Sequence, residues 1–349
     1  MVPEHLINPY AHTPESEFPH APRVQQNWTE HYTFYGYDAQ QGHGIHIHVG
    51  RLPADTRIWR AVIQVYLPGE ELLVTKVHGR DGDARGPGAG GFKADCIAPL
   101  RMWTMDFDGA LFTTTRPTVM RAILADGPAE PVRFHMALEA AGPIFGRNED
   151  LLEGRTSSTF HSEQVCRMSG YLKYRGRYLR LAGMGVRDHS SGPRDYGPVI
   201  ADIWFHGLFP DGTVVQTQVV RFERAQYKTA YIFRSDGSPL EMAELLEHPR
   251  VNDAATPPAS MASDPLLDPE RQFRIVMRTQ RGIETIEAEL LHAGVITYFA
   301  PVEEFLGTAV GRADGIQMCE SPVRLRWNGQ TGTGLRERVA RTHTLYVKP

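Results

Sequence analysis

One segment of the chain concentrates side chains that can do acid–base chemistry. Residues 187–197 hold two Asp, two Arg, one His and one Tyr within eleven positions. Carboxyl and imidazole groups can exchange protons, and guanidinium groups can bind an anion or pair with a carboxylate. Two interpretations follow: a functional site, or a structural turn in which Asp188 and Asp195 are neutralised by their arginine neighbours.

The runs on both sides of this segment indicate strands. Tyr178 to Val186 is apolar and rich in Gly, and from Val199 to Phe209 bulky and polar residues alternate. Alternation with a period of two is typical of a strand with one buried face. We therefore expect the charged segment to lie where one strand turns into the next, at a rim where β scaffolds commonly carry functional groups.

Turn signals and short β-rich runs recur along the whole sequence. Asp-Gly occurs six times and Asn-Gly once, mostly between runs rich in Val, Ile, Thr, Tyr and Phe. Because these residues accept the positive φ of tight hairpin turns, the pattern predicts antiparallel hairpins. Only residues 238–248 have a helical pattern, with a stripe of Met242, Leu245 and Leu246. The sequence therefore predicts an all-β fold of barrels or sandwiches.

Length and pattern favour two domains. A chain of 349 residues exceeds what a single core usually fills. The strand pattern is lost near residue 155, so we expect an N-terminal domain at 1–155 and a C-terminal domain at 156–349. Proline-rich residues interrupt the second half, and we expect a long loop there at 237–270.

Composition excludes several classes of protein. Lys and Arg number 37 against 41 Asp and Glu, and the basic residues are scattered, which argues against a nucleic-acid partner. Cys96, Cys166 and Cys319 are far apart in the sequence and indicate reduced, packed thiols. The first residues lack a targeting pattern, and no stretch reaches the roughly 18 apolar residues of a membrane span. We expect a cytoplasmic protein with no membrane span.

The charged segment and the residues before it resemble a known family. Residues 183–190, Gly-Met-Gly-Val-Arg-Asp-His-Ser, and the Gly-Pro-Arg-Asp at 192–195 are similar to the carotenoid 1,2-hydratase (hydroxyneurosporene synthase) superfamily and its AttH-like relatives. Further matching positions are Glu163-Gln164, Trp327-Asn328-Gly329, Gly332, Gly334 and Glu337. The resemblance covers most of residues 30–345 and implies two lipocalin-like antiparallel β-barrels packed side by side. It also implies hydration or dehydration of isoprenoid double bonds, or cyclisation as in more distant relatives.

The sequence departs from that group beside the matched Asp188. Carotenoid hydratases have a Tyr two positions before this Asp, where the chain has Val186, and close relatives have Trp in place of Ser191 and Tyr196. The resemblance therefore implies a fold and a class of reaction, whereas the identity of the substrate does not carry over.

Hydration of an unactivated alkene needs a proton donor and a place where a carbocation survives until water attacks. We predict Asp188 as the donor, because apolar surroundings would raise the pKa of its carboxyl group and keep it protonated. Tyr196 and His206 are further candidate catalytic residues, the latter as a group that holds or deprotonates water. This chemistry needs no cofactor and no metal, and we predict neither.

Strand geometry predicts which candidates share a face. Asp202, Trp204 and His206 alternate with apolar residues along one strand, so the ring of Trp204 can lie beside a cation. Asp188 and His189 are expected on opposite faces, with His189 orienting the segment rather than reacting.

Arg187 and Arg194 are compatible with a second kind of chemistry, in which they bind an anionic substrate. An Arg187 side chain close to Asp188 would lower the pKa of the carboxyl group, and the arginines could instead bind a substrate carboxylate. We predict substrate-binding roles for Arg187, His189, Arg194, Trp204, Glu163 and Glu337.

Three histidines in the first half suggest a metal alternative. His46 and His48 share one strand face, with His43 nearby, but a third ligand and a carboxylate are not specified by the local sequence. Ile45 and Ile47 occupy the other face and are predicted to be the core side, which leaves the histidines facing solvent.

The leading hypothesis is a cofactor-independent hydratase/dehydratase-type lyase, or an isomerase, using acid catalysis. Its substrate would be a hydrophobic isoprenoid-, steroid- or polyketide-like small molecule. The alternative is a noncatalytic lipocalin-like carrier of such a molecule, in which Asp188 would be ionised and tied to Arg187 or Arg194. A metal-dependent oxygenase or hydrolase that uses the three histidines is the third possibility. The sequence does not indicate the oligomeric state.

Overall fold

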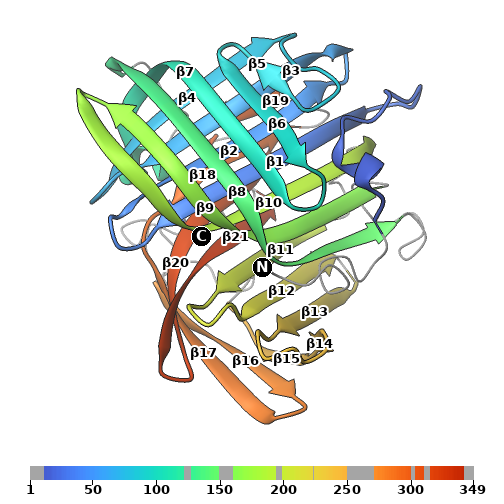
Figure 1. Cartoon of the computed structure of the whole chain (residues 1–349). Helices are drawn as coiled ribbons and strands as arrows, with labels where there is room; N and C mark the ends of the chain where they lie inside the picture. Colours follow the sequence, from blue (N-terminus) through green and yellow to red (C-terminus); the bar gives the residue numbers. More distant parts are fainter. Residues whose placement is uncertain are drawn as a thin grey trace, which may run out of the picture. The chain divides into compact units, whose positions relative to one another are not determined.

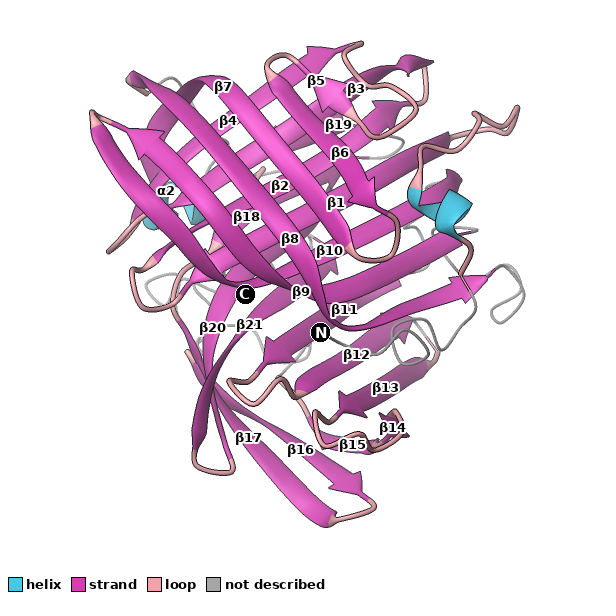
Figure 2. Ribbon diagram, viewed as in Figure 1, coloured by secondary structure: helices cyan, strands magenta, loops and turns pink. Residues whose placement is uncertain are grey.

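Antiparallel strands make up nearly all of the computed structural model (Figure 1, Figure 2). The structure describes residues 12–121, 127–148, 160–193, 199–222, 224–249, 271–299, 303–309 and 315–341. The chain divides into two compact units, residues 1–114 with 126–195 and residues 115–125 with 196–349. The predicted all-β class is confirmed.

The first unit contains a closed ring of strands. Its elements are η1 (Pro14–Glu17), β1 (Trp28–Asp38), β2 (His43–Leu52), β3 (Asp55–Tyr66), β4 (Glu71–Gly79), β5 (Gly88–Ala89), β6 (Phe92–Ala98), β7 (Met102–Thr115), β8 (Ala129–Asn148), β9 (Phe160–Tyr174) and β10 (Arg177–Pro193). Eight strands pair in the order β4-β3-β2-β1-β10-β9-β8-β7, and β4 also pairs with β7. This closure gives the lipocalin-like barrel that the resemblance implied.

Alternating residues fill the inside of this barrel. Tyr32 and Phe34 point inward from β1, and Ile45, Ile47 and Val49 point inward from β2, each at most 1% exposed. Successive residues of a strand face opposite sides, which is why the inward face collects the apolar residues. Burying each of these side chains contributes about 1.5–3 kcal/mol, so a packed core holds the strands that carry the polar groups.

The charged segment lies within a strand as far as Pro193. β9 and β10 form a hairpin whose two-residue turn, Arg175-Gly176, has φ values of 48° and 69°. β10 then runs through residues 187–193, paired with β9 as far as Ser191 and with β1 as far as Pro193. The expected turn is therefore wrong for these residues, because ladder pairing continues through them. Residues 194–198 lie outside the described part of the chain.

The second unit contains a ring that closes through a bent strand. Its elements are α2 (Arg116–Arg121), β11 (Val199–Leu208), β12 (Val214–Phe222), β13 (Gln226–Phe233), β14 (Glu241–Met242), β15 (Glu244–Glu247), β16 (Gln272–Thr279), β17 (Gly282–Leu290), β18 (Gly294–Phe299), β19 (Glu303–Leu306), β20 (Gly315–Trp327) and β21 (Gln330–Arg341). The order is β14-β13-β12-β11-β21-β20-β17-β16-β15, with β18 and β19 beside β20. Only Ala243 separates β14 from β15, and its N–H bonds to Ala230 O on β13. The unit is thus nearly barrel-shaped.

Two local predictions in this unit have different outcomes. The Asn-Gly hairpin is confirmed: Asn328 and Gly329 have φ values of 49° and 74° between paired Trp327 and Gln330.

The helix predicted at 238–248 is wrong, because β14 and β15 pair with neighbouring strands there. Leu245 is buried in the core while Met242 is 75% exposed, so the stripe does not pack as one face. Tertiary pairing overrides the local helical pattern.

The division of the chain differs from the predicted limits of 1–155 and 156–349. β9 and β10 follow residue 155 and complete the first barrel. α2 lies between two strands of the first barrel yet belongs to the second unit, where Val119 O accepts from Thr308 N at 2.9 Å. Of the loop predicted at 237–270, residues 250–270 lie outside the described residues.

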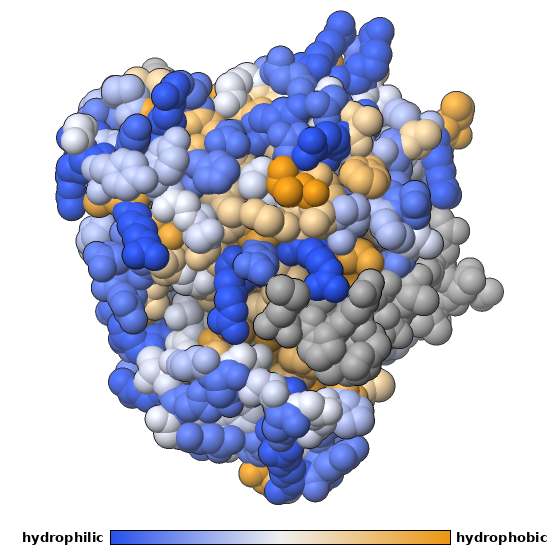
Figure 3. All heavy atoms as spheres, viewed as in Figure 1, coloured by the Kyte–Doolittle hydropathy of each residue, from blue (hydrophilic) through white to orange (hydrophobic). Residues whose placement is uncertain are grey.

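Charged and polar side chains cover much of the face seen in Figure 3. Among the described residues, the large apolar side chains that are exposed come from several strands and loops: Val24, Ile97, Phe112, Tyr178, Met242, Leu246 and Ile283. Scattered apolar residues of this kind are ordinary on a protein surface. In the described part of the chain, every helix is too short or too polar to cross a membrane.

Candidate active site on strands β9 and β10

Asp188 lies on the face of β10 opposite His189, as the strand period predicted, but this face points out of the barrel, so the carboxyl group is not in the apolar barrel interior expected for it. In the ladder it stands opposite Glu163 of β9 and Thr33 of β1. Its strand neighbours Arg187 and His189 turn into the barrel, where both are at most 3% exposed. The alternation places the carboxyl group of Asp188 apart from the inward guanidinium of Arg187.

The partner of Asp188 is His161, which the sequence did not single out. The imidazole Nε2 contacts the carboxylate Oδ2, and the two side chains are 30% and 13% exposed. Glu163, two residues along β9 from His161, is buried and completes a group whose ligand atoms lie within 4.8 Å of one another. The period of two along β9 could have identified His161, because it puts both residues on one face.

Arg187 has a carboxylate partner from the N-terminal segment. Its Nη1 lies 2.7 Å from Glu17 Oε2, and its Nε donates to Gln164 Oε1 at 2.9 Å. Glu17 also accepts from Trp103 Nε1 at 3.0 Å and Leu100 N at 3.2 Å. Burial raises the pKa of Glu17, but the charge and hydrogen bonds of Arg187 outweigh burial and lower the pKa below its usual value. The guanidinium group of Arg187 is therefore paired with Glu17 and Gln164 inside the barrel.

His189 also belongs to the inside of the barrel. Its Nε2 lies 3.0 Å from Glu30 Oε1, its Nδ1 lies 3.0 Å from Ser16 O, and its ring stacks on Tyr32 at 3.9 Å between centroids. This position agrees with the expected face opposite Asp188. The contacts fix the N-terminal segment to β1 and β10, a role in orientation rather than in reaction.

The remaining candidates of the second half are on β11 and β21. Trp204 and His206 share one face, with their ring centroids 4.1 Å apart and an interplanar angle of 74°. Asp202 on the same face accepts from Gln218 at 3.0 Å, and Glu337 stands opposite Trp204 in the ladder. The predicted common face is confirmed, and it lies in the second unit. Arg194 and Tyr196 lie outside the described residues.

The three histidines of the metal alternative are buried, so the expectation that they face solvent is wrong. His43, His46 and His48 are 3%, 1% and 6% exposed, because β2 is buried on both faces. Their partners also differ. His43 Nε2 bonds to Arg180 O at 2.8 Å, whereas His48 Nε2 lies 3.2 Å from His31 Nδ1. The expected core side, Ile45 and Ile47, is confirmed, and Val49 continues it.

A cavity of about 600 Å³ lies in the second unit against β15, β16, β17 and β20. Charged and apolar residues mix in its lining, among them Glu247, Phe273, Arg274, Glu289 and Arg324. Two of its ion pairs, Arg274 with Glu247 and Arg324 with Glu289, have distances of 2.9 and 3.0 Å. None of the predicted site residues contributes to this lining, and its charges differ from the apolar hollow that the leading hypothesis expects.

Comparison with known proteins identifies the family of this chain. A family model described as "Domain of unknown function (DUF7064)" matches residues 13–339. The chain belongs to this family. Comparison with curated protein sequences gives no match.

Solved structures share the fold at low sequence identity. An AttH-type protein of Nitrosomonas europaea is 13% identical, with a TM-score of 0.53 over 92% of this chain and 98% of that chain. CghA with Sch210972 is 10% identical, with a TM-score of 0.50 over 90% and 88%. Kievitone hydratase from Nectria haematococca is 11% identical, with a TM-score of 0.45 over 93% and 91%. The resemblance inferred from the motif is thus confirmed for the fold.

Proposed function

We propose that this protein is a hydratase/dehydratase-type lyase, or an isomerase, that uses Asp188 and His161 as a proton-transfer pair. The observation that carries the proposal is the contact between Asp188 and His161 on the outward face of β9 and β10. Both side chains are partly exposed, so a substrate can reach them, whereas the inward groups of β10 are enclosed. The fold similarity to the AttH-type protein is compatible with this activity.

The pair supplies both proton transfers that hydration requires. In the proposed reaction Asp188 acts in its protonated form: it gives its proton to one alkene carbon, and the π electrons form the new C–H bond and leave a carbocation. The oxygen lone pair of water forms the C–O bond, and neutral His161 takes the proton that the water loses. Transfer of this proton across the His161–Asp188 contact restores the starting state, so one alkene and one water give one alcohol. Dehydration is the same sequence reversed.

The substrate class remains the hydrophobic one inferred from the sequence. CghA, whose fold is similar, was crystallised with Sch210972. Glu163 is proposed to help orient His161, because both side chains lie on one face of β9.

The test compares two Asp–His pairs of the first unit. Purified protein is incubated with isoprenoid, steroid and polyketide alkenes or tertiary alcohols in ¹⁸O-labelled water, and products are followed by mass spectrometry. We expect D188N to lose turnover by about 10²-fold or more, the range of a positioned acid or base. The matched control is D106N, because Asp106 forms a 2.9 Å pair with His135 on an exposed surface.

The carrier alternative gives a different result in the same experiment. A carrier retains its ligand in the wild-type protein and in D188N, and incorporates no ¹⁸O in either. Equal turnover in D188N and D106N would also defeat the proposed role of Asp188.

A further inference from the structure

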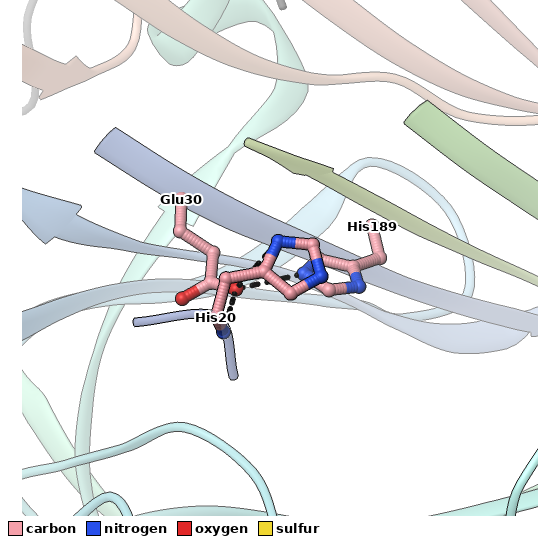
Figure 4. A group of neighbouring side chains, drawn as sticks. All are labelled: His20, Glu30 and His189. Atoms are coloured by element: carbon pink, nitrogen blue, oxygen red, sulfur yellow. Dashed lines mark hydrogen bonds and ion pairs between the residues drawn. The ribbon is translucent and has the colours of Figure 1, made fainter. Parts of the chain in front are cut away.

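Three potential ligands converge inside one end of the first unit, on the face of β10 opposite Asp188. They are His20 from the N-terminal segment, Glu30 from β1 and His189 from β10 (Figure 4). Glu30 Oε1 lies 3.0 Å from His189 Nε2 and 3.7 Å from His20 Nδ1. The His20 side chain is 27% exposed, and the other two are at most 2% exposed.

The hydrogen bonds of His189 require a positive centre beside its Nε2. Its Nδ1 lies 3.0 Å from the carbonyl oxygen of Ser16, which only accepts, so Nδ1 carries the hydrogen. Its Nε2 faces the carboxylate of Glu30, which is again only an acceptor when ionised. Two acceptors do not attract each other, so a proton or a metal ion must lie between Nε2 and Oε1.

The distances suit a small divalent ion. Zinc binds imidazole nitrogen and carboxylate oxygen at about 2.0–2.2 Å, which places tetrahedral ligand atoms about 3.3–3.6 Å apart. The separations of 3.0 and 3.7 Å fall on either side of this value. Two imidazoles and one carboxylate also form a donor set that favours zinc over magnesium or calcium.

Two of the three side chains, His189 and Glu30, are held by outer partners, as metal ligands commonly are. The Ser16 carbonyl orients His189, and Arg51 Nε donates to Glu30 Oε2 at 2.9 Å. Ser191 Oγ lies 2.9 Å from His20 Nδ1, close enough to supply or orient a fourth ligand. The backbone N–H of His20 also donates to Glu30 Oε1 at 2.6 Å, which fixes the carboxylate between the two rings.

Aromatic rings enclose this group. Tyr32 stacks on His189, and Phe160 meets both imidazoles edge-on, with centroids 4.9 Å from His20 and 5.0 Å from His189. With Ser191 Oγ as a fourth ligand, the four-coordinate site would fit a structural rather than a catalytic metal. The ligands join the segment before β1 to strands far along the chain.

We propose that His20, Glu30 and His189 bind one zinc ion that fastens the N-terminal segment to the end of the first barrel. The site is distinct from the Asp188–His161 pair, because β10 directs His189 and Asp188 to opposite faces. Its loss would loosen the segment that carries Glu17, without removing a group that the proposed reaction uses.

The test measures metal in the full-length, tag-free protein. Elemental analysis after purification without chelator should give one zinc per chain, and titration of the stripped protein with zinc or cobalt(II) should saturate at one equivalent and raise Tm. We expect H20Q to weaken binding by at least about 10-fold, as expected for loss of a ligand. The control H135Q removes an imidazole that lies beside an exposed carboxylate and should bind zinc as wild type does.

Cobalt(II) absorption of the wild-type protein provides a readout that needs no variant, because imidazole and carboxylate coordination in a four-coordinate site gives visible bands. An unmetallated protein whose Tm does not respond to zinc would overturn the proposal and leave a proton between His189 and Glu30. Undiminished zinc binding in H20Q would overturn it as well.

Discussion

Glu17 and Arg187 form a charge contact that is enclosed inside the first barrel. Its side chains are 0% and 4% exposed, and Trp103 and Gln164 satisfy further polar atoms. We expect E17Q to lower the free energy of unfolding by about 3–5 kcal/mol, because it leaves a buried guanidinium without its counter-charge. Urea unfolding measures this loss. The exposed pair of Asp55 and Arg57 is the control, and D55N should change the urea midpoint much less.

The same pair predicts how stability depends on pH. The pKa of Glu17 is lowered in the folded protein, because Arg187 more than offsets the effect of burial. A carboxyl group with a lowered folded pKa stabilises the fold above its unfolded pKa of about 4.5, and this contribution is lost as pH falls through the folded value. The urea midpoint should therefore fall steeply in acid. E17Q should show a shallower acid dependence, and an identical slope would argue against this assignment.

Two buried thiols are expected to be inert. Burial raises the pKa of Cys96 and of Cys166 to about 12. At about pH 8 roughly one thiol in 10⁴ is then a thiolate, which is the reactive form. A disulfide reagent such as DTNB should react with them slowly in the native protein and rapidly in urea. Rapid labelling of either residue without denaturant would show that its surroundings open.

Residue-level prediction succeeded where it rested on the period of a strand. It placed Asp188 and His189 on opposite faces and Trp204 with His206 on one face, because alternation is a local property. It could not find the partners of these residues. Glu17 lies 170 positions before Arg187 and approaches it only when the barrel closes. His161 was missed because its contact with Asp188 depends on the pairing of β9 with β10.

At the element scale, Gly170 shows why some strand positions exclude a side chain. Its φ is 143°, and an added Cβ would lie 2.0 Å from His135 O on the neighbouring strand β8. We expect G170A to lower Tm more than G282A does. Gly282 also has a positive φ, of 110°, but an added Cβ there meets nothing within 4 Å. The difference between the two variants isolates the backbone clash from the strain of the φ angle, and equal Tm losses would contradict it.

The hairpins and the mistaken helix show the limits of element prediction. Asn328-Gly329 was predictable because positive φ is required at both turn positions and these residues supply it. Residues 241–247 were not, because two short strands there depend on β13 and β16 for their hydrogen bonds. A stripe of Met and Leu carries no information about such distant partners.

For the whole molecule, the strand order predicts which fragments can fold. A fragment of residues 1–155 lacks β9 and β10, so its ring would have open edges at β1 and β8. A fragment of residues 1–195 contains all eight ring strands. We expect dispersed amide NMR signals and cooperative unfolding only from the longer fragment. Cooperative folding of 1–155 would show that the last two strands are dispensable.

The first barrel can close only after its last strand has been synthesised. β1 pairs with β10 so that Trp28 meets Pro193, although 165 positions separate them. At about 5–20 residues per second, β1 waits roughly 8–30 s after it is made before its second partner exists. During that interval its unpaired edge is available to other chains. A nascent chain of this protein should therefore depend on ribosome-associated chaperones until β10 has emerged from the ribosome.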